Sequence, residues 1–233
     1  MGIIGGADGP TAIYLGSGIL KDIQLSPGPA IALLAVLCLA AYFIGNLSPS
    51  TILAKRQGLN IKEEGSGNAG TTNALRVMGK KAGAITMVVD ILKGLAAALL
   101  GGLFMGEFGM ACCGLMVVLG HIWPVIYRFK GGKGVATVFG AILAINPLMA
   151  LICLIVVAIF VFATKRMSVG SIAGGIFLPA ISLVMEPLFF PEALVIGVIV
   201  VLKHRANIVR LIHGEEPVMS IFDKKNKTDS QRD

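Results

Sequence analysis

Charged residues are scarce in this chain, because only 14% of its 233 residues are Asp, Glu, Lys or Arg. Soluble domains carry about 25% charged and about 45–50% apolar residues, whereas here 55% of residues are hydrophobic and the mean hydropathy is +0.84. This deficit excludes an ordinary soluble domain and predicts an integral membrane protein. The first three residues lack a basic segment and a cleavage site, so we expect no cleaved signal peptide.

Cysteine and histidine are also rare, with four and three residues. The cysteines lie inside apolar runs, with no Cys-x-x-Cys spacing and no nearby histidine. Such residues behave as small buried hydrophobes more often than as disulfides or metal ligands. The sequence therefore predicts no metal site and no cofactor.

Apolar runs of transmembrane character occupy most of the chain, and they predict an all-α polytopic membrane protein with about seven transmembrane helices. The fourth and seventh runs are short, so we expect them to use flanking residues. The runs are residues 31–53, 84–105, 110–126, 134–145, 148–163, 169–185 and 193–202. We expect an extension at residues 1–30, a transmembrane domain at 31–216 and a polar tail at 217–233.

Lys and Arg residues occur in every second loop between these runs. They follow the first, third, fifth and seventh runs, whereas the loops after the second, fourth and sixth runs contain none. Cytoplasmic loops are enriched in these residues. The pattern predicts an extracytoplasmic N-terminus and a cytoplasmic C-terminus. It also accounts for the net charge of +7 without nucleic acid as a partner.

A first polar cluster covers residues 65–73, with the sequence Gly-Ser-Gly-Asn-Ala-Gly-Thr-Thr-Asn. Its glycines match G-x-G-x-x-G, but no strand precedes them, so a dinucleotide-binding fold is not indicated. The alternative is a flexible loop. The density of hydroxyl and amide groups favours a site for phosphate oxygens or a polyol, with Ser66, Asn68, Asn73 and Arg76 as candidates.

A second cluster, at residues 129–134, reads Phe-Lys-Gly-Gly-Lys-Gly between two apolar runs. Backbone amides and ammonium groups together suit a small anion such as phosphate. A Walker A loop needs Ser or Thr after its Lys, but Gly134 follows Lys133, so nucleotide hydrolysis is not supported. Lys130 and the amides of Gly131, Gly132 and Gly134 are candidate anion ligands.

A third cluster begins at His204 and ends at Glu216. His204 and Asn207 lie at helical spacing and share a face if the helix continues beyond the membrane. The alternative, a basic segment that binds anionic lipid, explains the nearby arginines but not these two residues.

Two smaller polar pairs each have two possible roles. Asp90 and Lys93 lie within an apolar run and form either a structural pair or an extension of the active site. Ser168 and Ser171 either cap a helix or donate to a bound phosphate.

Together the three clusters resemble the bacterial PlsY-type acyl-phosphate:glycerol-3-phosphate acyltransferases, and the resemblance extends from about residue 31 to residue 216. It implies transfer of a fatty acyl group from acyl phosphate to the 1-hydroxyl of glycerol 3-phosphate, the first step of phospholipid synthesis. It also implies a bacterial plasma-membrane location, an active site at the cytoplasmic face, contact with membrane lipid and a functional link to an enzyme that produces acyl phosphate.

The resemblance implies a set of site residues, with His204 or a substrate phosphate as the general base. The expected catalytic residues are Ser66, Asn68, Lys133 and His204. The expected substrate-binding residues are Asn73, Arg76, His121, Lys130, Gly131, Gly132, Gly134, Thr137, Ser168, Ser171, Asn207 and Glu216. The thioester-dependent His-x-x-x-x-Asp pair is missing, because Ile126, Val209 and Val218 occupy the fifth position after each histidine. An anion transporter remains the alternative function.

Overall fold

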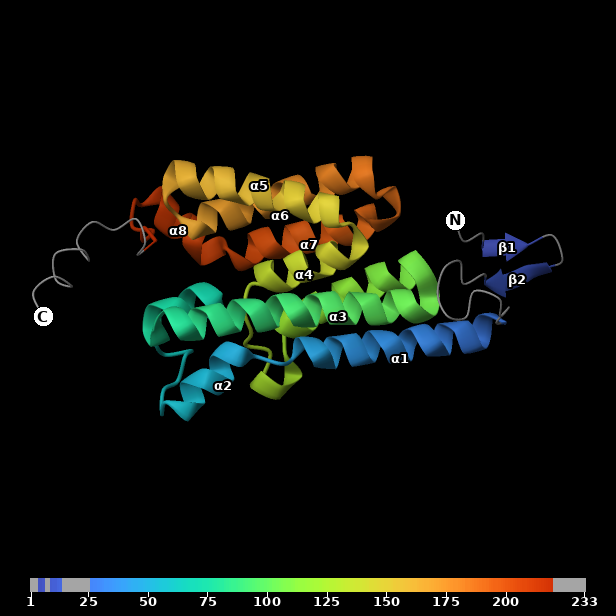
Figure 1. Cartoon of the computed structure of the whole chain (residues 1–233), viewed down its shortest axis with the longest axis horizontal. Helices are drawn as coiled ribbons and strands as arrows, with labels where there is room; N and C mark the ends of the chain where they lie inside the picture. Colours follow the sequence, from blue (N-terminus) through green and yellow to red (C-terminus); the bar gives the residue numbers. More distant parts are fainter. Residues whose placement is uncertain (1–3, 7–8, 14–25, 220–233) are drawn as a thin grey trace, which may run out of the picture.

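The computed structural model describes residues 4–6, 9–13 and 26–219, and its helices lie between residues 27 and 212 (Figure 1). The helices are α1 (Pro27–Gly45), α2 (Pro49–Arg56), α3 (Thr71–Ile122), α4 (Val135–Ile145), α5 (Pro147–Thr164), α6 (Met167–Met185), α7 (Phe190–Lys203) and α8 (Arg205–Ile212), with 3-10 turns η1 (Val125–Tyr127) and η2 (Pro187–Phe189). Two short strands, β1 (Ile4–Gly6) and β2 (Gly9–Ile13), form an antiparallel hairpin. The rest of the predicted extension up to residue 25, and the tail beyond residue 219, lie outside the described residues.

Several helices are apolar enough to cross a membrane, as predicted. Among the described residues, four have the necessary length, and the bent pair formed by η2, α7 and α8 adds a fifth if it is counted as one span. Helix α4 is apolar but only 11 residues long. Many large apolar side chains are exposed, including Phe162 and Val184 at 67% and 82%, as expected for surfaces that face lipid.

Helix α3 contains two of the predicted runs, because the chain reverses within it. Met105 and Gly106 have non-helical backbone angles, and Gly106 has a φ of 61°. Gly101 and Gly109 lie in backbone contact, although residues eight apart in a straight helix are about 12 Å apart. Only glycine permits that approach, so 84–105 and 110–126 form an antiparallel helical hairpin.

The predicted run at residues 31–53 is not one continuous helix. Helix α1 ends at Gly45, and α2 begins at Pro49, which cannot donate a helical hydrogen bond. The freed carbonyls of Gly45 and Leu47 accept hydrogen bonds from the Lys93 ammonium at 3.1 and 2.6 Å. The break is therefore stabilised by a charged side chain from a neighbouring helix.

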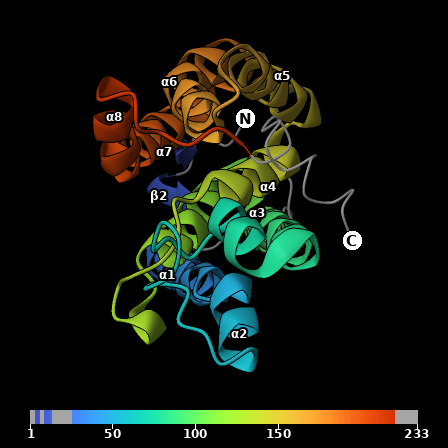
Figure 2. The same ribbon diagram turned by 90° about the vertical axis from the view of Figure 1, so that its left-hand side faces the viewer.

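The helices pack in layers. Helix α3 contacts α1 on one side and α4 on the other, while α5, α6 and α7 form an adjoining group (Figures 1 and 2). A single large apolar core joins these groups and includes Val117, Ile142, Met149 and Ile196. Helices α2 and α8 and the start of α3 lie at the end of the bundle opposite the β1–β2 hairpin (Figure 1). This end contains the three polar clusters.

Candidate active site

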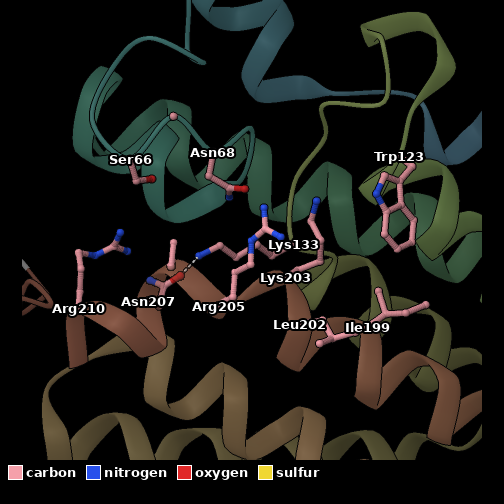
Figure 3. A pocket seen from close by; sticks show the side chains of 12 residues that line it. Ser66, Asn68, Trp123, Lys133, Ile199, Leu202, Lys203, Arg205, Asn207 and Arg210 are labelled. Atoms are coloured by element: carbon pink, nitrogen blue, oxygen red, sulfur yellow. Dashed lines mark hydrogen bonds between the residues drawn. The ribbon is translucent and has the colours of Figure 1, made fainter. Parts of the chain in front are cut away.

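A cavity of about 560 Å³ lies where the three clusters meet (Figure 3). Ser66 and Asn68 lie on one wall, Lys133 enters from the glycine-rich loop, and Asn207 comes from α8. The structure thus brings together residues that are up to 144 positions apart in the sequence. The remaining lining residues are Gly67, Trp123, Ile199, Leu202, Lys203, Arg205, Ala206 and Arg210.

The first loop is held in shape by the buried amide of Asn73. Its Oδ1 accepts a hydrogen bond from the backbone N–H of Ser66 at 2.8 Å, and its Nδ2 donates to the carbonyls of Ile61 and Glu64 at 3.2 and 3.0 Å. These bonds use both ends of the amide, so Asn73 positions Ser66 and does not line the cavity.

The second loop differs from the prediction at two of its amides. The N–H groups of Gly131 and Gly132 donate to the carbonyls of Ile122 and His121 at 3.3 and 3.2 Å. They satisfy the C-terminal end of α3 and are not free to hold an anion. These two amides therefore bond within the fold, and the Lys133 ammonium is the group of this loop that reaches the cavity.

Gly134 has a φ of 87° and precedes α4 as its N-cap residue, a conformation that favours glycine. Lys130 is exposed and lies outside this cavity. Lys133 therefore lines the cavity, while Gly134 has a local structural role at the start of α4.

A continuous set of polar contacts connects Lys133 to α8 and the segment after it. The Lys133 ammonium donates to Oδ1 of Asn207, and Nδ2 of Asn207 donates to Oε1 of Glu216 at 2.6 Å. The Nε of Arg210 donates to Oε2 of the same carboxylate at 2.7 Å. Glu216 therefore orients Asn207 and Arg210 from behind the cavity wall.

These surroundings shift the pKa values of Lys133 and Glu216. Burial, together with the positive charges of Arg210 and Arg76, lowers the pKa of Lys133 to about 8, although the Glu216 carboxylate opposes the shift. Burial alone would raise the pKa of Glu216, but hydrogen bonds and the Arg210 charge hold it below its usual range. The Lys133 ammonium therefore predominates at neutral pH, but it loses its proton at a lower pH than an ordinary lysine does.

His204 lies at the junction where α7 and α8 bend by 52°. The predicted continuous helix is therefore broken, yet His204 and Asn207 are both buried. Nδ1 of His204 donates to the carbonyl of Val200 at 2.8 Å. Burial and the Lys133 charge lower its pKa to about 4, and the imidazole does not line the cavity.

Four other predicted residues lie outside the cavity lining. Thr137 is fully buried within α4, and Ser168 is buried near the start of α6. Ser171 donates to the carbonyl of Met167 at 3.0 Å, so it bonds within its own helix. Arg76 is exposed in the first part of α3. None of these four residues lines the cavity.

Asp90, Lys93 and His121 form a buried polar cluster behind the second loop. The Lys93 ammonium lies 2.8 Å from Asp90 Oδ1 and 2.8 Å from His121 Nδ1. The His121 ring contacts Gly132 so closely that a Cβ there would overlap it. The Lys93 ammonium thus connects Asp90 to the α1 break and to His121 behind the second loop.

The sequence interpretation missed the apolar part of the lining. Trp123, Ile199 and Leu202 lie together on one side of the cavity (Figure 3). The Lys and Arg residues after the seventh run were used only to assign the cytoplasmic side. Two of them, Lys203 and Arg205, also line the cavity. The single tryptophan of the chain, two residues beyond His121, was the one available signal, because the other residues lie within ordinary apolar or basic runs.

The comparisons with known proteins identify the family. A family model described as glycerol-3-phosphate acyltransferase matches residues 35–214. The chain belongs to the glycerol-3-phosphate acyltransferase family. The glycerol-3-phosphate acyltransferase of Finegoldia magna (strain ATCC 29328 / DSM 20472 / WAL 2508) is 47% identical over 187 residues, which cover 78% of this chain and 94% of that relative. The Clostridioides difficile (strain 630) protein is 42% identical over 193 residues, covering 78% and 93%.

Solved structures of this acyltransferase family have the same fold. The glycerol 3-phosphate form of PlsY (YgiH), an integral membrane glycerol 3-phosphate acyltransferase, superposes with a TM-score of 0.78 at 34% identity and covers 82% of this chain and 99% of its own. Its lysophosphatidic acid form gives 0.72 at 37% identity, covering 79% and 94%. The predicted PlsY-type resemblance is confirmed, and the chain is a membrane acyltransferase of this type.

Proposed function

We propose that this acyltransferase moves a fatty acyl group from acyl phosphate to the 1-hydroxyl of glycerol 3-phosphate. The products are lysophosphatidate and inorganic phosphate. PlsY structures in glycerol 3-phosphate and lysophosphatidic acid forms support this choice of acceptor and product. The acyl-phosphate donor follows from the predicted resemblance and from the chemistry of the cavity.

The two-sided lining of the cavity carries the proposal. Trp123, Ile199 and Leu202 offer apolar surface on one side, whereas Lys133 and Arg210 supply positive charge. An acyl phosphate has this polarity, because an aliphatic chain is joined to an anionic head. The acceptor is a second phosphate ester, and the several cations of one cavity suit two phosphates better than one.

The proposed reaction needs no protein nucleophile, since a mixed anhydride is already activated. The acceptor hydroxyl oxygen forms a bond to the carbonyl carbon, and the carbon–oxygen bond to phosphate breaks. The Lys133 ammonium stabilises the developing negative charge on the oxyanion and the leaving phosphate, and Ser66 and Asn68 add hydrogen bonds.

The proton of the hydroxyl leaves with a phosphate oxygen. The low pKa of His204 and its hydrogen bond to the Val200 carbonyl make it a weak base, which favours a substrate phosphate dianion as the proton acceptor. His204 then holds the α7–α8 junction and, through it, Asn207.

We further propose seven membrane crossings in a bacterial plasma membrane, with the cavity at the cytoplasmic face. The two halves of α3, the short α4 and the bent α7 supply the crossings beyond those that length alone indicates. The cationic loops 55–81, 128–133 and 203–210 all lie at the end of the bundle that contains the cavity, as expected for a cytoplasmic side. The acyl phosphate then comes from a separate enzyme in that compartment or membrane.

Purified protein in detergent, supplied with palmitoyl phosphate and radiolabelled glycerol 3-phosphate, tests the proposal. We expect labelled lysophosphatidate and an equal amount of phosphate. Palmitoyl-CoA in place of palmitoyl phosphate should give no product, and product from the thioester would contradict the proposed donor. Because detergent removes the second compartment, product formation also excludes a purely transporting function.

A further inference from the structure

A second cavity of about 430 Å³ lies beside the candidate active site. Lys62, Lys130 and Lys203 line it, together with Gly67 and the rim residue Phe129. Lys203 and Gly67 also line the first cavity, so the two cavities share a wall. The second cavity is thus a lysine-lined space that borders the proposed reaction site.

The positive charge of the second cavity is not neutralised within it. Three lysines line the cavity and one carboxylate, Glu63, opposes them, so a net positive charge remains. Burial and the neighbouring charges of Lys130, Lys55 and Arg128 lower the pKa of Lys62. An anion bound here would relieve this like-charge repulsion.

Two of the lysines are held in position by contacts with aromatic residues. The Lys62 ammonium donates to the carbonyl of Tyr127 at 3.1 Å and lies 5.3 Å from the centre of the Tyr127 ring. The Lys203 ammonium lies 5.4 Å from the centre of the Trp123 ring. Cation–π contacts of this kind limit the motion of a lysine, so the ammonium groups are partly preorganised.

The backbone at the rim adopts an unusual conformation. Arg128 and Phe129 have left-handed φ angles of 55° and 60°, which are uncommon for residues with large side chains and concentrate at functional sites. This turn brings Lys130 to the cavity and leaves Phe129 58% exposed at its edge.

We propose that the second cavity is a separate phosphate subsite, bounded by Lys62, Lys130 and Lys203, which holds a phosphate group beside the reaction site. The ligand chemistry is a phosphate mono- or dianion. Its source is either free phosphate, entering or leaving the first cavity, or the headgroup of an anionic phospholipid. That the subsite borders a reaction site rests on the proposed function, whereas phosphate binding by the three lysines does not depend on that function.

Calorimetric titration of the full-length protein with inorganic phosphate, in an uncharged detergent and without acyl donor, tests the subsite. We expect at least two binding events, one of which belongs to the second cavity. Lys62→Gln together with Lys130→Gln should weaken that event by about tenfold or more, because charge-assisted contacts are lost. Lys133→Ala should instead weaken phosphate binding in the first cavity. Lys80→Gln with Lys81→Gln removes the same charge from exposed positions of α3 outside both linings and should leave both events unchanged.

The retained event in the Lys62/Lys130 variant shows that the protein is folded. A single event in the wild type, or two unchanged events in the Lys62/Lys130 variant, would overturn the subsite. An equal loss in the Lys80/Lys81 variant would also overturn it, since it would indicate only general attraction. A protein that binds two phosphates but makes no lysophosphatidate would instead refute the proposed function and leave the subsite intact.

The same titration in lipid nanodiscs distinguishes the two sources. If a lipid headgroup occupies the second cavity, nanodiscs that contain phosphatidylglycerol should abolish the Lys62/Lys130-dependent event, while phosphatidylcholine nanodiscs retain it. If free phosphate is the ligand, the event should persist in both. Its absence from both kinds of nanodisc and from detergent would overturn the proposal.

Discussion

The Lys133 ammonium donates a hydrogen bond to Oδ1 of Asn207, 74 residues away in the sequence. This contact joins the glycine-rich loop to α8 and brings a half-buried cation to the cavity. The other end of the Asn207 amide donates to Glu216, so the direction of the Asn207 side chain is determined. Lys133 is thus positioned before any substrate arrives, which is the arrangement that favours electrostatic catalysis.

Lys133→Ala should therefore lower the rate of acyl transfer. Removal of one preorganised donor to a developing oxyanion typically reduces kcat by about 100- to 1,000-fold, and we expect a loss in this range. The assay is lysophosphatidate formation by purified protein in detergent. Lys165→Ala, at an exposed loop position, is the matched control and should retain wild-type rates. Wild-type turnover in Lys133→Ala would remove this residue from the mechanism.

The lowered pKa of Lys133 predicts an alkaline limit to activity. As the pH rises through about 8, the ammonium loses its proton and its charge, so kcat/KM should fall. This profile reports the free enzyme. Lys133→Arg keeps a charge at higher pH, because a guanidinium titrates above about 12. Any activity retained by that variant should show no decline near pH 8. If kcat/KM of the variant falls near pH 8 as it does in the wild type, the decline belongs to a group other than Lys133.

The positions of the three polar clusters could be predicted from sequence, because hydrogen-bonding residues stand out in a chain that is 55% hydrophobic. Their convergence followed from the alternation of cationic loops. The direction of individual side chains could not be predicted. Asn73 belongs to a polar cluster, yet it turns inward to hold the loop, and the contact between Lys133 and Asn207 depends on packing between distant helices.

The backbone breaks could be predicted only in part. The reversal of α3 at Gly106 lies between the predicted runs 84–105 and 110–126, whereas the run at residues 31–53 gave no sign of a break. The break after Gly45 depends on hydrogen bonds from Lys93 to freed carbonyls. Such long-range compensation is a property of the fold and not of local sequence.

Glu216→Gln should destabilise the protein, because it replaces a buried carboxylate that accepts from Asn207 and Arg210. An amide cannot accept at both ends, so one buried donor loses its partner at a cost of about 1–3 kcal/mol. Thermal unfolding in detergent should show a lower Tm than for the exposed Glu215→Gln control.

The pH dependence of this stabilisation has a definite sign. Because the folded state lowers the pKa of Glu216, the contribution is present above the unfolded value of about 4.3 and is lost as the pH falls through the folded value. The Tm difference between wild type and Glu216→Gln should therefore shrink on acidification. A difference that grows at low pH would contradict the assignment.

Gly132→Ala should displace the second loop. A Cβ at this position would overlap the His121 ring and would lie 3.0 Å from the Ala69 carbonyl oxygen, so the loop or the ring must move. We expect a lower Tm and a loss of acyl transfer of about tenfold or more, since small displacements of catalytic groups are costly. Gly28→Ala is the matched control, because open space surrounds that site. Normal activity in Gly132→Ala would show that the loop tolerates displacement.

Asp90 and Lys93 should behave as an energetically coupled pair. Both side chains are at most 3% exposed and lie 2.8 Å apart. Removal of one partner from a buried ion pair costs about 3–5 kcal/mol, because the other charge is left without compensation. Lys93→Met should cost more than Asp90→Asn, since the ammonium also donates to the Gly45 and Leu47 carbonyls at the α1 break.

A double-mutant cycle measures this coupling. The combination of Asp90→Asn with Lys93→Met should cost less than the two single changes together, because the second change removes the uncompensated charge left by the first. A residual cost should remain, since the carbonyls at the α1 break have then lost their donor. Tm in detergent gives the stabilities, and lysophosphatidate formation shows whether the second loop is still supported. Strictly additive effects would mean that the two side chains do not interact, and the support of the loop would then depend on His121 alone.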